Sequence, residues 1–149
     1  MSKQYSDEVS DRVQQRTKEI FNKFKQSQHF SNMHKYCQKE SNSVVRELGR
    51  FLYSYELIQP GDWTLDMFLA QVYNIQRKCM YSKNFFKALP KVIYHFSLFC
   101  EENNIGGDFN REEIEHYYKD LKKGDYRYLF YSSWEEGYQV RKKQFDTYF

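Results

Sequence analysis

Apolar residues recur at intervals of three and four along most of the chain, the spacing that places them on one face of a helix. We expect a short amphipathic turn or helix near residues 30–36 and a last helix from Ser133 to about Thr147. The main predicted helices are 6–27, 41–56, 65–78, 82–104 and 110–124.

Polar residues suited to N-capping stand at the starts of four predicted helices, namely Ser6, Thr64, Ser82 and Asn110. Glu113 follows Asn110 at the spacing of a capping box. Trp63 precedes the Thr64 cap and is placed to pack on Phe68 as a hydrophobic staple. Local chemistry therefore indicates where these helices begin.

The stretch from Ser82 to Asn104 has the widest apolar face, and we expect it to form the central helix. Pro90 lies inside it, where a proline removes one backbone hydrogen bond and clashes with the preceding turn. Because the phenylalanine stripe continues in phase across Pro90, the pattern favours a kinked helix over a break.

The composition points to one helical domain. The chain has only 6 Gly and 2 Pro in 149 residues, too few for a turn-rich β sandwich or barrel. We expect an all-α bundle of five or six helices with a core rich in its 14 Tyr and 13 Phe. Residues 30–106 would form the helical core, and residues 107–149 an acidic, aromatic C-terminal helical extension.

No catalytic or cofactor motif is present, so we expect neither an enzyme nor a cofactor, and no small-molecule substrate. His29, His34 and Cys37 lie close in sequence, but ordinary histidines and a buried thiol explain them better than a metal site. The three cysteines, Cys37, Cys79 and Cys100, are predicted to be reduced and buried. With neither a secretory leader nor an apolar run long enough for a membrane, a soluble cytoplasmic protein is expected.

Positive charge gathers in the middle of the chain. Residues 31–100 hold 9 Lys/Arg against 5 Asp/Glu, whereas residues 101–149 hold 8 against 11. Lys83, Lys87 and Lys91 are four residues apart and form a line on one helix face. Such a line suits contacts with phosphates, although a solvated face on a mildly basic protein gives the same pattern.

Three consecutive segments resemble the N-terminal core-binding domain of tyrosine recombinases, the SAM-like phage-integrase type. The resemblance covers about residues 30–106 and rests on the sequences SNSVVRELGRFLYSYELI, PGDWTLDMFLAQVYNIQRK and YSKNFFKALPKVIYHFSLFCEENNI. The matching positions include Arg50-Phe51-Leu52, Thr64, Ser82, Phe96, Phe99, Glu102 and Ile105. Pro90 and Phe85 depart from the pattern, and the tail after Asp108 lacks the family's catalytic Arg, His-x-x-Arg and Tyr set.

The resemblance implies a non-enzymatic module from a phage or mobile element that clamps double-stranded DNA by its phosphate backbone. Carried over, the contact set is Arg77, Lys78, Ser82, Lys83 and Lys87, and the charge pattern adds Lys91, Arg46 and Arg50. The alternative is a protein-interaction, inhibitor or adaptor module that forms homo-oligomers or docks on a partner through its aromatic tail. The tail residues expected at that contact are Tyr126, Tyr128, Phe130, Trp134 and Tyr138.

Overall fold

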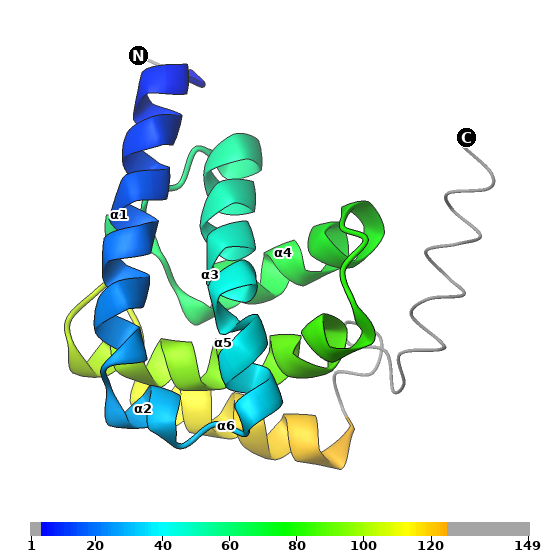
Figure 1. Cartoon of the computed structure of the whole chain (residues 1–149). Helices are drawn as coiled ribbons and strands as arrows, with labels where there is room; N and C mark the ends of the chain where they lie inside the picture. Colours follow the sequence, from blue (N-terminus) through cyan, green and yellow to red (C-terminus); the bar gives the residue numbers. More distant parts are fainter. Residues whose placement is uncertain (1–3, 125–149) are drawn as a thin grey trace.

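The computed structural model describes residues 4–124, which fold as a helical bundle (Figure 1). No strand occurs in this part of the chain, and the all-α prediction is confirmed. The elements are α1 (Asp7–Lys25), α2 (Gln28–Ser31), α3 (Lys35–Glu56), the 3-10 turn η1 (Pro60–Asp62), α4 (Leu65–Lys78), α5 (Lys83–Glu102) and α6 (Arg111–Lys123).

The predicted caps are confirmed. Each cap side chain accepts a hydrogen bond from the backbone N–H three residues later, at 3.1–3.3 Å, in Ser6, Thr64, Ser82 and Asn110. Trp63 packs on Phe68 with 5.5 Å between ring centroids, as the staple prediction required. Gly124 ends α6 in the left-handed conformation, with φ of 84°. Local signals therefore located four helix starts correctly.

The predicted start of the second long helix was wrong. α3 begins at Lys35 rather than near Ser41, and His34 precedes it without a side-chain capping bond. Ser41 is buried, and its hydroxyl donates to the carbonyl of Gln38 at 2.7 Å instead of capping a helix. The extra turns of α3 pack against the core through Cys37, an apolar residue among polar neighbours that is only 1 % exposed.

α3 shares the centre of the bundle with α5. α3 packs against α1, α4 and α5, while α5 also contacts α2 and α6. Figure 1 shows α1 (blue) running alongside α3 (cyan), and α6 lying below α5. α5 continues through Pro90 without a break, and the Tyr117 hydroxyl of α6 donates to the Pro90 carbonyl at 2.9 Å.

Aromatic rings fill the core around Phe96 of α5. Its ring centroid lies 5.2 Å from that of Phe24, 5.9 Å from that of Phe68 and 5.9 Å from that of Trp63. All four side chains are fully buried. These contacts join α1, α4, α5 and the turn after η1 through one cluster of interlocking rings.

All three cysteines are free and buried, as predicted. In the described part of the chain, no helix combines the length and the apolar character needed to cross a membrane. After α5, Gly106 is left-handed, with φ of 94°, and Asn104 takes this conformation as well, with φ of 54°.

α1 approaches α3 closely at Gly49. A Cβ atom there would lie 2.7 Å from Thr17 Oγ1, 3.1 Å from Thr17 Cγ2 and 3.3 Å from Trp63 Cζ2. Thr17 cannot easily move aside, because it is buried and its hydroxyl donates to the Val13 carbonyl at 2.7 Å.

We predict that Gly49→Ala lowers the free energy of unfolding by about 1–3 kcal/mol, since overpacking outweighs the gain in helix propensity. Urea denaturation measures this. Gly61→Ala is the control, because nothing lies within 4 Å of a Cβ atom there. The double variant Gly49→Ala/Thr17→Ala should regain part of the loss. A Gly49→Ala protein as stable as the native one would contradict the packing argument.

His95 gives stability a pH dependence. It is half-buried on α5, and burial, followed by the nearby His29, lowers the pKa of its imidazole from 6.5 to about 4. At pH values between these two pKa values, the His95 imidazole is protonated in the unfolded chain but neutral in the folded chain. Stability therefore falls as the pH drops from 6.5 to 4.

We predict that His95→Gln flattens this part of the stability profile. The loss in melting temperature between pH 6.5 and pH 4 should be smaller in the variant than in the native protein. Calorimetry across this range tests it, and His34→Gln, at an exposed histidine that makes no ion pair in the described structure, is the control. Identical pH profiles for native and His95→Gln proteins would refute the assignment.

Candidate nucleic-acid interface

The exposed side of α3 is a strip of cations. Lys35, Lys39, Arg46 and Arg50 are all exposed and follow one another at spacings of four, seven and four residues. These spacings keep them on one side of the helix. α3 also carries three carboxylates: Glu40 is half-buried, Glu47 is buried, and Glu56 ends the helix.

Glu47 holds the two arginines in place. Its carboxylate is 3 % exposed and accepts hydrogen bonds from Arg50 and, at 3.3 Å, from the Cys79 thiol. Arg46 lies beside it, with 3.7 Å between Nε and Oε1. Burial alone would raise the pKa of this carboxyl, but the hydrogen bonds from Arg50 and Cys79 and the two positive charges lower it.

The first half of α5 adds three lysines next to this strip. Lys83 and Lys87 are exposed, and neither makes an ion pair in the described structure. Lys91 is half-buried, and its ammonium group donates to the Tyr36 hydroxyl at 2.7 Å. Lys87 also approaches Tyr36, at 5.7 Å from the ring centroid. Through its contacts with Tyr36 of α3, the predicted line of lysines therefore lies beside the start of the strip of cations.

Tyr81 joins the two sets of cations at their other end. Its hydroxyl accepts a hydrogen bond from Arg46 at 3.0 Å, and its ring stacks on Phe85 with 4.0 Å between centroids. The loop before α5 is thereby fastened to α3. We call the resulting surface the basic face, made of Lys35, Lys39, Arg46, Arg50, Lys83, Lys87 and Lys91.

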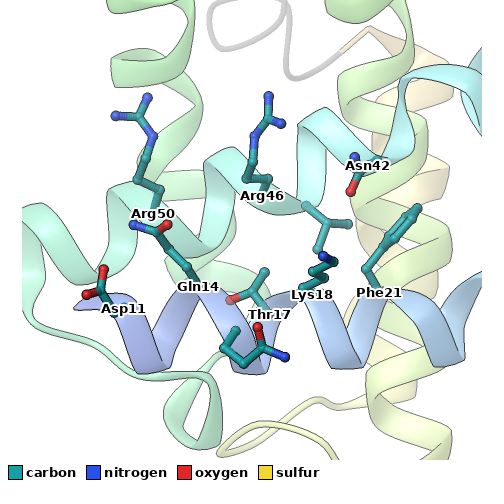
Figure 2. Close-up of a pocket in the computed structure, with 10 residues that line it drawn as sticks. Asp11, Gln14, Thr17, Lys18, Phe21, Asn42, Arg46 and Arg50 are labelled. Atoms are coloured by element: carbon teal, nitrogen blue, oxygen red, sulfur yellow. The ribbon is translucent and has the colours of Figure 1, made fainter. Parts of the chain in front are cut away.

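A groove between α1 and α3, lined mostly by polar and charged residues, borders the basic face (Figure 2). Its volume is about 450 Å³, and its lining combines amides, cations and a few apolar groups. Figure 2 shows Arg46 and Arg50 extending from α3 in the same direction, away from α1. Lys18 adds a third cation from α1, and Asp11 is the one carboxylate among the lining residues.

Two predicted contact residues lie elsewhere, and a third has its hydroxyl engaged. Arg77 faces outward from α4, 5.0 Å from the Tyr73 ring centroid. Lys78 reaches the end of α3, where it donates to the Tyr55 hydroxyl. The Ser82 hydroxyl accepts the N-capping bond of α5. The predicted set thus divides between the basic face and the end of α4.

Several residues of this surface were not predicted from the sequence. Lys35 and Lys39 were overlooked because α3 was predicted to begin after them, although their spacing of four was visible. Lys18, Gln14 and Asn42 reach the groove through the packing of α1 on α3, which no local signal announces. The predicted partner contacts Tyr126, Tyr128, Phe130, Trp134 and Tyr138 lie outside the described residues.

The residues considered for a metal do not converge. His29 pairs with Glu102 of α5, and the His34 ring stacks on Tyr36 with 6.0 Å between centroids. Within residues 4–124, no group of three or more His, Cys, Asp or Glu side chains is arranged to hold a metal ion. Burial and the Glu47 carboxylate raise the pKa of the Cys79 thiol to about 12, so it is a poor nucleophile.

Comparison with known proteins returned no matching family model, no matching curated protein and no matching solved structure. The proposed function therefore rests on the structure of the chain itself.

We predict that Glu47→Gln lowers the free energy of unfolding by about 2 kcal/mol, because it removes the charge that accepts from Arg50 and leaves the arginines unpaired. The folded-state pKa is lowered, so this contribution is present above pH 4.5 and disappears on acidification. Urea titrations at neutral and acidic pH test both points. Glu40→Gln, which breaks no observed ion pair on the same helix, should be nearly neutral; an equal loss in both variants would contradict the network's role.

Proposed function

We propose that this protein binds duplex DNA without catalysing a reaction, by placing the basic face along the phosphate backbone. Phosphate contacts by Lys and Arg supply most sequence-independent affinity for DNA. A protein–DNA complex also uses such contacts to fix its register on the duplex. The proposal rests on one observation: cations from two helices gather on one surface, where Glu47 is buried and paired with Arg46 and Arg50 and Glu40 is half-buried.

Acidic side chains lie at the end of α5 opposite to its lysines, where the cations Lys23 and Arg111 also occur. Asp66, Glu112 and Glu113 line a separate polar groove of about 470 Å³ at the starts of α4 and α6. Glu101 and Glu102 end α5, whereas Lys83 and Lys87 begin it. A helix of 20 residues is about 30 Å long, several times the screening length of roughly 8 Å in physiological salt. The acidic end therefore does not cancel the field of the basic face.

The basic face also suits phosphate because several of its cations are already ordered. Tyr36 holds Lys91 and Tyr81 holds Arg46 by hydrogen bonds to neutral hydroxyls. Ordering a long side chain before binding reduces the entropy lost in the complex. The resemblance to the core-binding domain of tyrosine recombinases implies contacts at Lys83 and Lys87, which belong to the same surface.

We predict that the native protein binds a DNA duplex at low salt and that its affinity falls steeply as salt rises. Each neutralised phosphate contributes about −0.9 to the slope of log K against log salt. Lys83→Ala/Lys87→Ala should therefore make the slope less steep by about 2. Fluorescence anisotropy over a salt series measures this, and both lysines are exposed, so the fold should survive.

The matched control is Lys23→Ala/Lys25→Ala. These exposed lysines end α1 and are not among the residues of the basic face, and their loss changes the net charge by the same amount. The control should leave the salt slope within error of the native value. Absence of binding at low salt would refute the proposed function, and equal slopes for the two double variants would refute its assignment to this face.

A further inference from the structure

Two rows of polar side chains line the groove between α1 and α3 (Figure 2). The row on α1 is Asp11, Gln14 and Lys18, and the row on α3 is Asn42, Arg46 and Arg50. Spacings of three or four residues keep each row on one side of its helix. The row on α3 extends over about 12 Å of the helix axis. Figure 2 shows Gln14 and Lys18 extending from α1 toward α3.

Three of these side chains are available to a ligand. Gln14, Lys18 and Asn42 are exposed, and none of them makes a hydrogen bond or an ion pair within residues 4–124. The neighbouring Gln15, by contrast, donates to Glu19 at 3.4 Å. The groove therefore offers one ammonium group and two carboxamide groups, all of which can donate hydrogen bonds to an acceptor.

The charge of the groove favours an anion as that acceptor. Lys18, Arg46 and Arg50 line it together with Asp11. When the buried Glu47 that pairs with both arginines is counted as well, three cations stand against two carboxylates and leave one net positive charge. Asp11 precedes Lys18 by seven residues, about 10 Å along α1, so this carboxylate does not neutralise the ammonium group directly.

Continuity with the basic face favours a nucleic-acid strand as the anion. Arg46 and Arg50 belong both to the groove and to the basic face, so the two surfaces meet at these arginines. A strand carries phosphates at regular intervals and can occupy both surfaces, whereas a small anion fills only one. In protein–DNA complexes, phosphate oxygens accept hydrogen bonds from Asn and Gln side chains as well as from Lys and Arg. The groove supplies this combination of donors.

We propose that one strand of the DNA duplex extends from the basic face over the groove between α1 and α3. Lys18 pairs there with a phosphate, and Gln14 and Asn42 donate hydrogen bonds to phosphate oxygens. α1 is then a third helix of the DNA contact, in addition to α3 and α5. This inference rests on the proposed function, because the basic face supplies the rest of the contact.

The two kinds of contact have different salt dependences. A lysine paired with a phosphate releases counterions, so Lys18→Ala should make the slope of log K against log salt less steep by about 0.9. A carboxamide carries no charge, so Gln14→Ala/Asn42→Ala should weaken binding about tenfold and leave the slope unchanged. Fluorescence anisotropy with a DNA duplex over a salt series measures both quantities. All three side chains are exposed, so the variants should fold.

The matched controls are Lys25→Ala for the charge and Asn22→Ala/Gln26→Ala for the amides. These three residues are exposed near the end of α1, and none of them lines the groove. Both controls should bind DNA as the native protein does. If the groove variants bind like these controls while the double lysine variant of α5 binds more weakly, this inference is wrong and the proposed function stands. If the native protein binds no duplex, both fail.

A small phosphorylated ligand is the other source of the same oxygen atoms. Pyrophosphate presents phosphate without a polymer, and the expected result is that the native protein shows no saturable binding of pyrophosphate in titration calorimetry. Saturable binding that Lys18→Ala abolishes, together with an unchanged DNA affinity in that variant, would assign the groove to a small ligand and overturn the inference.

Discussion

The rotational setting of α3 about its own axis is the constraint on which the surface of this protein depends. On one side Gly49 allows α1 to approach so closely that no Cβ atom fits beside Thr17. On another side Glu47 is buried against the Cys79 thiol in the loop before α5. With both sides fixed, the strip from Lys35 to Arg50 has to face solvent. The fold thus decides which side of α3 is available to a partner.

Glu47 illustrates how one group serves both stability and surface chemistry. Burying a carboxylate is costly unless it is paired and hydrogen-bonded, and here two arginines and a thiol supply the partners. The arginines reach the carboxylate from the solvent side, and their side chains stay about half exposed. The same pairing that satisfies the buried charge therefore orders Arg46 and Arg50, and the two arginines together keep one net positive charge at the surface.

Local signals in the sequence were enough for the fold class and for four helix starts, because caps and helical periodicity act within a few residues. They failed at α3, where Cys37 is the one buried hydrophobic residue between Lys35 and Glu40 and the pattern looks polar. The candidate site was partly visible, since Lys83 and Lys87 are neighbours by helical spacing alone. The sequence could not show the tertiary contacts. Tyr36 bonds Lys91, which is 55 positions away in the chain, and Tyr81 bonds Arg46, which is 35 positions away.

These tyrosine contacts connect the composition to the charge of the protein. Lys91, Arg46 and Lys78 each donate to a tyrosine hydroxyl, and Arg77 and Lys122 lie against tyrosine rings. A carboxylate in place of each tyrosine would also hold the cation, but it would cancel the charge. A neutral phenol orders the side chain and leaves the positive field directed outward. Part of the large tyrosine content therefore has a physical role beyond the core: it orders cationic side chains without neutralising them.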